Sequence, residues 1–229
     1  MYLVHVDTFE LRYFPTVKDA SAAKYVTLSH RWAQAPDDEP TFQELKQWSL
    51  TMRRKPGYLK LCEAANIVRR QGDCDWLWID TCCINKDFSA ELQEGINSMW
   101  EIYRQSQWCL VYLSDVTCDP ASSTSDRESV LLASNFRTSK WFTRGWTLQE
   151  LLAPPRLNFF ISDPVRGWTL FGRREVLREL ISTIIEIPSG LLADRNLELA
   201  LREPDWRQQL TAQNVICNLP TTCDTRLLR

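Results

Sequence analysis

Four short stretches of the chain have the length and composition of buried strands. They are Tyr25–Leu28, Trp76–Ile79, Cys109–Leu113 and Leu157–Ile161, and most of their side chains are apolar or β-branched. Strands that are buried on both faces have this composition, because helices cover both sides of a parallel sheet. The pattern therefore predicts a parallel sheet built around these four segments.

Helical periodicity occupies the intervals between these strands. The strongest pattern follows Ser89, where apolar residues recur at the spacing of one helix face: Leu92, Ile96, Met99, Trp100 and Tyr103. Further helices are expected over Phe42–Leu45, Tyr58–Gln71, Trp146–Leu152 and Leu177–Ile185, with Gly72, Pro154 and Pro188 after the last three. Strands that alternate with helices indicate an α/β fold with helices flanking the sheet.

The remaining segments have weaker patterns. Residues 2–14 contain two short extended pieces, so a small N-terminal β element is expected. Residues 114–126 are rich in Asp, Pro, Ser and Thr and indicate a loop. Residues 189–229 are polar, weakly periodic and interrupted by prolines. We therefore expect a folded domain over residues 1–188, followed by a poorly ordered tail over residues 189–229.

Composition and charge exclude several classes of protein. The chain has 27 Lys and Arg against 29 Asp and Glu, so no general basic field exists to hold nucleic acid. The densest basic run, Arg53–Lys55, is short and is interpreted as a solvated loop. No apolar run approaches 18 residues, which predicts no membrane span. The first residues lack the features of a secretory signal, so a cytoplasmic location is expected.

The eight cysteines are expected to be reduced in that compartment. No C-x-x-C pair occurs and only two histidines are present, so no metal site is predicted. Most of these thiols are expected to be small core residues. One enzymatic alternative remains open, a cysteine hydrolase in which Cys82 or Cys83 works with His30.

Polar and aromatic residues follow the predicted strands at their carboxyl ends. Ligands of open parallel sheets bind at this edge. The residues that it brings together are Ser29, His30, Arg31, Trp32, Asp80 and Asn85. This mixture suits a nucleotide, because arginine binds phosphate, tryptophan stacks on a ring and carboxylates bind ribose hydroxyls. The structural alternative is that Trp32 and Trp78 are core aromatics and that Asp80 caps a turn.

Glu150 is a second candidate for chemistry. It follows Trp146 by four residues and therefore shares a helix face with it. Its neighbours are leucines, and a carboxylate in apolar surroundings has a perturbed affinity for protons. The structural alternative is an ion pair between Glu150 and either Arg144 or Arg137.

Three blocks in register closely resemble the fungal heterokaryon-incompatibility (HET) domain. They are Tyr25-x-x-Leu28-Ser29-His30-x-Trp32, Trp78-Ile79-Asp80-Thr81-Cys82-Cys83-Ile84-Asn85 and Arg144-Gly145-Trp146-Thr147-Leu148-Gln149-Glu150-Leu151. The resemblance extends over residues 1–188. It implies a role in self/non-self recognition, in which the domain triggers cell death.

The same blocks are similar to Toll/interleukin-receptor (TIR) domains, which implies a flavodoxin-like fold. The box Trp146-x-x-x-Glu150-Leu151 resembles the TIR box, with Thr147 where cysteine usually stands. In enzymatic TIR domains this glutamate is the catalytic residue for cleaving NAD. The resemblance therefore implies Glu150 as the catalytic residue and NAD, or a related nucleotide, as the substrate. No separate cofactor is implied.

The remaining candidate residues then become ligand contacts. They are Ser29, His30, Arg31, Trp32, Asp80, Asn85, Arg144 and Trp146, with Trp32 or Trp146 as the aromatic wall. Two departures from the family stand out. Ala33 replaces a glycine that permits positive φ, and no arginine-rich helical segment follows residue 188, so the tail is diverged or truncated. The competing function is a non-enzymatic module that self-associates or recruits other cell-death proteins.

Overall fold

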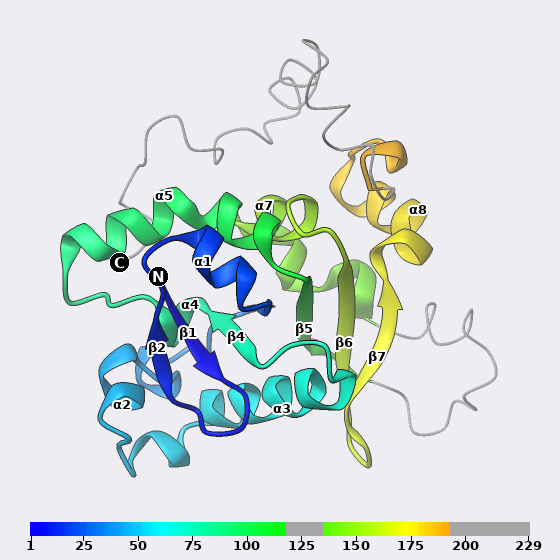
Figure 1. Ribbon diagram of the computed structural model, residues 1–229. Coiled ribbons are helices and arrows are strands. Elements are labelled where there is room, and N and C mark those ends of the chain that lie inside the picture. Colours follow the sequence, from blue (N-terminus) through cyan, green and yellow to red (C-terminus); the bar gives the residue numbers. More distant parts are fainter. Residues whose placement is uncertain (118–134, 193–229) are drawn as a thin grey trace.

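The computed structural model describes residues 1–117 and 135–192, which form a mixed sheet with helices on both faces (Figure 1). The strand order is β2-β1-β4-β3-β5-β6-β7. The strands are β1 (Tyr2–His5), β2 (Leu11–Tyr13), β3 (Tyr25–His30), β4 (Trp76–Ile79), β5 (Trp108–Thr117), β6 (Leu157–Asp163) and β7 (Gly167–Arg173).

The four central strands confirm the predicted parallel arrangement. β3 pairs in parallel with β4 on one side and with β5 on the other, and β5 pairs in parallel with β6. In chain order these strands are arranged 2-1-3-4, which is how a flavodoxin-like sheet begins. Both outer parts of the sheet are antiparallel, since β1 pairs with β2 and β4, and β7 pairs with β6. The whole sheet is therefore mixed rather than purely parallel.

The helices form two layers. In Figure 1, α1, α5 and α7 lie on one side of the sheet and α3 lies on the other. The helices are α1 (Val17–Ala22), α2 (Phe42–Lys46), α3 (Pro56–Gln71), α4 (Asp80–Cys83), α5 (Ser89–Gln105), α7 (Thr147–Leu152) and α8 (Arg174–Ile185). Short 3-10 turns cover Pro36–Asp38, Met52–Arg54, Asn135–Thr138, Lys140–Thr143 and Ser189–Leu192.

Local signals explain where several helices begin and end. Thr16 and Thr41 form capping boxes at the starts of α1 and α2, because each side chain accepts a backbone N–H three residues later. Gly72 ends α3 with φ 69°, a left-handed angle that glycine adopts without a steric penalty. The predicted helix over Tyr58–Gln71 is thereby confirmed and begins two residues earlier.

Two segments predicted as loop or tail carry regular structure in their described part. The sequence predicts loop for residues 114–117, but they extend β5, in which Leu113 and Val116 are both buried and the register with β6 shifts between Leu113 and Thr117. The rest of that predicted loop, residues 118–126, lies outside the described residues. In the predicted tail, the turn Ser189–Leu192 buries Leu192, and residues 193–229 lie outside the described part.

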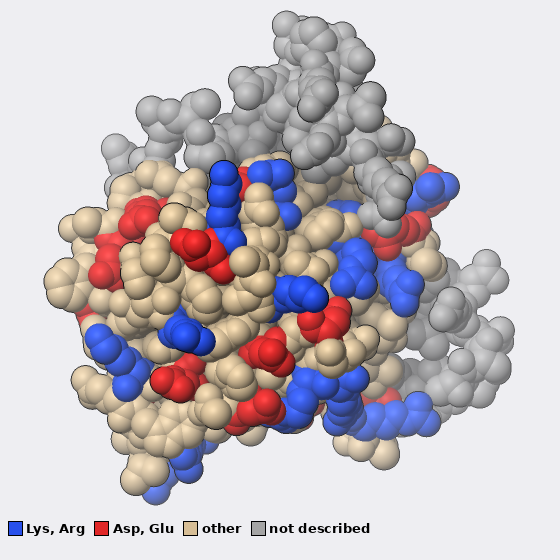
Figure 2. Space-filling model, in the orientation of Figure 1, with Lys and Arg blue, Asp and Glu red and all other residues tan. Residues whose placement is uncertain are grey.

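The core lies between the sheet and both helical layers. Its largest fully buried side chains include Trp78, Trp141, Tyr25, Tyr103, Phe136 and Phe159. Four cysteines are core residues as expected, namely Cys74, Cys82, Cys83 and Cys109. On the surface drawn in Figure 2, basic and acidic side chains are interspersed over most of the face.

Gly57 in α3 should not tolerate alanine. An added Cβ would lie 2.7 Å from the Asp38 carbonyl oxygen and 2.8 Å from Pro40 Cδ. Glycine-to-alanine changes in helices usually stabilise by about 1 kcal/mol, but here we expect a loss of about 2 kcal/mol, because backbone must move. Urea denaturation measures this. Gly95→Ala in α5 is the control, since the atoms nearest to its added Cβ all belong to the Ile84 side chain, from 3.3 Å, and it should change stability by less than about 1 kcal/mol.

Candidate functional site

A cavity of about 260 Å³ opens at the carboxyl ends of the parallel strands. Its wall consists of Arg31, Trp32, Asp80, Ile84, Lys86, Leu92, Ile96, Met99, Arg144 and Trp146. Five of the nine residues predicted from the sequence are in this set: Arg31, Trp32, Asp80, Arg144 and Trp146. These five residues come from the segment after β3, the start of α4 and the segment that leads into α7. Helix α5 adds the apolar side chains Leu92, Ile96 and Met99 to the wall.

Glu150 lies directly behind this wall. Only 1% of its surface is exposed. Its Oε2 accepts a hydrogen bond of 2.6 Å from the Ser29 hydroxyl, and Ser29 Oγ in turn accepts the Trp141 indole N–H at 2.7 Å. The end of β3 thereby holds the helix that carries the carboxylate. Sequence reasoning predicted Ser29 and Glu150, but it missed Trp141.

Arg144 separates the Glu150 carboxylate from the cavity. Its guanidinium donates to both carboxylate oxygens, with Nη1 2.9 Å from Oε2 and Nη2 3.1 Å from Oε1. Burial opposes the charge on Arg144, but the carboxylates of Glu150 and Asp80 outweigh burial and raise the pKa of Arg144. The ion pair that the sequence offered as the structural alternative for Glu150 is therefore present, and its partner is Arg144.

Asp80 forms the acidic part of the cavity wall. Its Oδ2 accepts the Trp32 indole N–H at 2.8 Å, which fixes that ring at the opening. Burial alone raises the pKa of Asp80, but the adjacent His30 imidazole and the charges of Lys86 and Arg144 outweigh burial and lower it. Asp80 is therefore an anion at neutral pH.

Buried polar and charged side chains support the wall from behind. His30 lies between Asp80 and Lys60, with Nε2 3.4 Å from Asp80 Oδ1 and Nδ1 3.1 Å from Lys60 Nζ. Lys60 also pairs with Glu39, whose carboxylate accepts the Ala33 N–H at 2.7 Å. This network connects the segment after β3 to α3 and fixes the position of Trp32.

Ala33 does not disturb this segment. The sequence has alanine where the resembled family usually has glycine, which raised the question of backbone strain. The non-glycine residues with positive φ in the described part of the chain are Phe9, Lys24, Trp48 and Glu186. Because Ala33 is not among them, its backbone adopts an angle that alanine accepts without strain.

Lys86 lines the cavity but was missed from the sequence. Its ammonium lies 3.7 Å from the centroid of the Trp32 ring, which is a cation–π contact. With Arg31 and Arg144 it gives the wall three cations against the single carboxylate of Asp80. The one signal in the sequence is its position directly after Asn85, a residue of the predicted site. The lining itself is therefore net positive, with the carboxylates of Glu150 and Asp115 beside Arg144 and Arg31 outside the lining.

Asn85 stays outside this cavity. The helical turn α4 reorients the chain after Asp80, so Asn85 accepts a hydrogen bond of 3.4 Å from Gln43 of α2 instead. It lines a separate, smaller hollow of about 120 Å³ beside the N-terminal strands. Arg31 reaches the cavity and lies 4.0 Å from Asp115 at the end of β5.

The two cysteines of the hydrolase alternative, Cys82 and Cys83, are buried residues of α4 itself. Burial raises the pKa of the Cys82 thiol well above its usual value, whereas a nucleophilic cysteine needs a lowered one. The Cys83 sulfur accepts the Ile79 N–H at 3.4 Å and lies 3.8 Å from the Leu77 carbonyl oxygen. His30 faces Asp80 and Lys60. This arrangement disfavours a cysteine nucleophile.

Two searches of the described residues concern other classes of site. In residues 1–117 and 135–192, no three His, Cys, Asp or Glu side chains come together as metal ligands would. Across the same residues, every helix is too short or too polar to span a bilayer.

Comparisons with known proteins support the family resemblance. The family model "Heterokaryon incompatibility protein (HET)" matches residues 25–129. The chain is 38% identical over 183 residues to vegetative incompatibility protein HET-E-1 of Podospora anserina. That alignment covers 80% of this chain and 13% of the relative, so the chain spans a small part of that protein's length. No solved structure matches the chain. On the family match and the identity to this relative, the chain belongs to the heterokaryon incompatibility (HET) family.

Proposed function

We propose that this HET domain acts in heterokaryon incompatibility in the cytoplasm and that it does so by cleaving NAD at the nicotinamide–ribose bond. The relative named for vegetative incompatibility supports the biological role. The parallel strand order and the Trp146–Glu150 box support the likeness to TIR domains. The observation that carries the chemistry is the cationic, aromatic cavity with Glu150 directly behind Arg144.

The cavity accommodates one end of a dinucleotide. Sites for drug-sized ligands have volumes of about 300–1,000 Å³, and this cavity measures about 260 Å³. We infer that the nicotinamide ring stacks on Trp32 or Trp146 and that Arg31 and Lys86 bind the pyrophosphate. The adenosine end then lies outside the cavity.

Cleavage requires a carboxylate next to the ribose. The bond between nicotinamide nitrogen and ribose C1′ breaks, and its electron pair leaves with neutral nicotinamide. Positive charge then develops on the sugar, as in glycoside hydrolysis. The Glu150 carboxylate stabilises that charge, and water adds to C1′ with loss of one proton, which gives ADP-ribose.

Ligand binding should also expose Glu150. In the present arrangement Arg144 occupies both carboxylate oxygens. A pyrophosphate in the cavity competes for the same guanidinium, because arginine binds phosphate in the same bidentate way as it binds carboxylate. Movement of Arg144 toward the phosphate then leaves Glu150 free to face the ribose. The resting state is closed in this proposal, and the substrate opens it.

The experiment measures nicotinamide release from NAD by wild type and Glu150→Gln at high protein concentration. We expect the substitution to lower kcat by at least about 100-fold, as loss of a transition-state electrostatic contact does. Glu101→Gln is the control, because Glu101 forms a similar two-bond pair with Arg104 on the exposed face of α5. Its activity should equal that of wild type.

A second variant tests the proposal even if substitutions at Glu150 impair folding. Trp32 is 39% exposed, so Trp32→Ala should fold normally and raise KM by about tenfold through lost stacking. Equal release by wild type and folded Glu150→Gln contradicts the proposal. So does the absence of release from concentrated, folded wild type, and that result favours the self-association module instead.

A further inference from the structure

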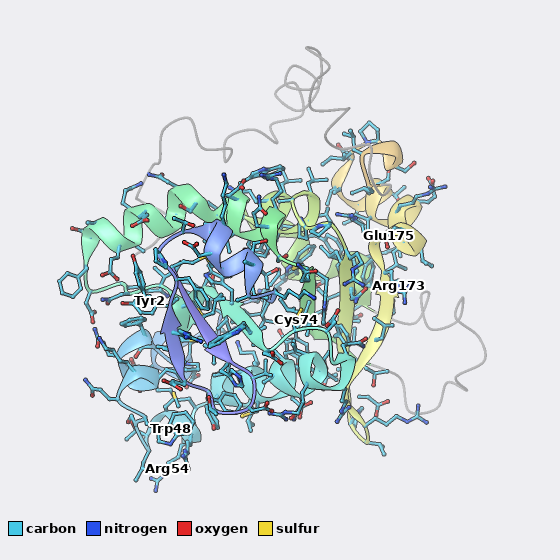
Figure 3. All side chains as sticks on the ribbon, viewed as in Figure 1. Tyr2, Trp48, Arg54, Cys74, Arg173 and Glu175 are labelled. Carbon is cyan, nitrogen blue, oxygen red and sulfur yellow. The ribbon has the colours of Figure 1, made fainter. Side chains whose placement is uncertain are left out.

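A surface tip carries aromatic and basic side chains that the proposed function does not use. It comprises residues 46–54, between α2 and α3, with Lys46, Trp48, Leu50, Arg53 and Arg54 exposed. Figure 3 labels Trp48 and Arg54 at the same corner of the molecule, and Figure 2 shows basic side chains among uncharged atoms there. The exposed fraction is 73% for Leu50 and 39% for Trp48.

The backbone of this tip places a large aromatic residue where glycine fits best. Trp48 follows α2 with φ 54°, and its N–H donates to the Leu45 carbonyl at 3.1 Å. Left-handed residues after helices are usually glycine, because a side chain there costs stability. Phe9 also has positive φ, and its ring centroid lies 6.3 Å from that of Trp48. The backbone has positive φ both at Trp48 and at Phe9, the aromatic residue beside its ring, and strain of this kind points to a functional surface.

The charge of the tip has one sign. No acidic residue lies between Glu44 and Glu63 in the sequence, and Glu44 is already neutralised by Lys55 at 2.8 Å. The Arg53 guanidinium lies 5.0 Å from the centroid of the Trp48 ring. The tip therefore presents cations next to apolar side chains, with no carboxylate of its own segment to offset them.

We infer that this tip docks the domain on the surface of an anionic lipid bilayer. Leu50 and the Trp48 ring enter the interfacial layer, and Lys46, Arg53 and Arg54 contact lipid phosphates. Tryptophan suits this depth, because its ring is apolar while its N–H remains hydrogen-bonded. Such contact with the bilayer is peripheral and reversible, since only two side chains insert and three cations contact lipid phosphates.

The shape of the tip favours a bilayer over an acidic protein. Neither of the two cavities described above is lined by residues 46–54. Protein partners usually bury a hot-spot side chain in a matching pocket, whereas a fluid lipid surface accepts single protruding side chains. An acidic protein partner is therefore the alternative outcome of the test.

The test is co-sedimentation of the whole chain with vesicles of phosphatidylcholine alone or mixed with phosphatidylserine. We expect binding to the anionic vesicles only, weakened by 0.5 M salt. Arg53→Ala/Arg54→Ala should weaken it by about 30-fold, because each cation near an anionic surface contributes about fivefold. Leu50→Ser should weaken it by about tenfold.

Matched controls lie on the hairpin formed by β6 and β7, away from the tip. Val165 is 88% exposed, and Arg173, labelled at the right of Figure 3, is also exposed. Val165→Ser and Arg166→Ala/Arg173→Ala should bind as wild type does. Absence of binding to anionic vesicles overturns the inference, as does equal loss in tip and control variants. Binding to soluble polyglutamate that requires Leu50, without vesicle binding, indicates an acidic protein instead.

Discussion

Replacing Glu150 with alanine should lower the free energy of unfolding by about 3 kcal/mol. The change removes the acceptor for three donors, namely the Ser29 hydroxyl and both terminal nitrogens of Arg144. Breaking a buried ion pair from one side costs about 3–5 kcal/mol, because it leaves an uncompensated charge. We place the loss at the lower end of this range, since the Arg144 side chain is 20% exposed and the cavity supplies water to it.

Urea denaturation of wild type and Glu150→Ala measures this loss. Glu101→Ala is the matched control, because Arg104 also donates two hydrogen bonds to Glu101, through Nε and Nη2, and these side chains are 42% and 39% exposed. Exposed pairs contribute about 0–1 kcal/mol, so the control should change little. Equal effects of the two substitutions would show that the Glu150 network does not hold α7 to the sheet.

Trp141→Ala should be more destabilising still, by about 4 kcal/mol. Trp141 is completely buried, and its ring packs edge-on against Phe142 and Phe159 with centroid distances of 5.0 and 5.6 Å. Removing a buried tryptophan leaves a cavity, which costs about 3–5 kcal/mol. The substitution also removes the indole N–H that Ser29 accepts.

Two further variants separate packing from hydrogen bonding at this position. Trp141→Phe keeps most of the ring contacts and loses the N–H, so it should cost about 1–2 kcal/mol. Phe88→Ala removes an aromatic side chain that is 60% exposed and should cost less than about 1 kcal/mol. Thermal and urea unfolding measure all three. A loss as small for Trp141→Ala as for Phe88→Ala would contradict the packing argument.

The central strands were predictable because their burial on both faces leaves an uninterrupted apolar signal. The six residues of β3 are all buried, as are three of the four residues of β4. β7 gave no such signal, since it lies at the edge and its side chains are partly or fully exposed. The extension of β5 was hidden by Ser114 and Asp115, polar residues that usually indicate loop.

Residues of the candidate site could be predicted where they follow the carboxyl ends of parallel strands, since ligands bind at that edge. They could not be predicted where packing between distant segments fixes their position. Ser29, Asp80 and Arg144 follow from the sheet rule and from the family blocks. Trp141 lies in a short 3-10 turn with no periodic pattern, so only the folded chain shows that it donates to Ser29. Asn85 was misplaced relative to the cavity because the α4 turn has no signal in sequence.

The contact between Ser29 and Glu150 joins positions 121 residues apart in the chain. Loop closure over such a distance is entropically unfavourable, so folding is slow when contacts of this kind dominate. A recombinant fragment limited to residues 25–129 would include β3 but lack Trp141, Arg144 and Glu150, and Ser29 would be buried without either partner. Expression boundaries for this domain should therefore continue through α8.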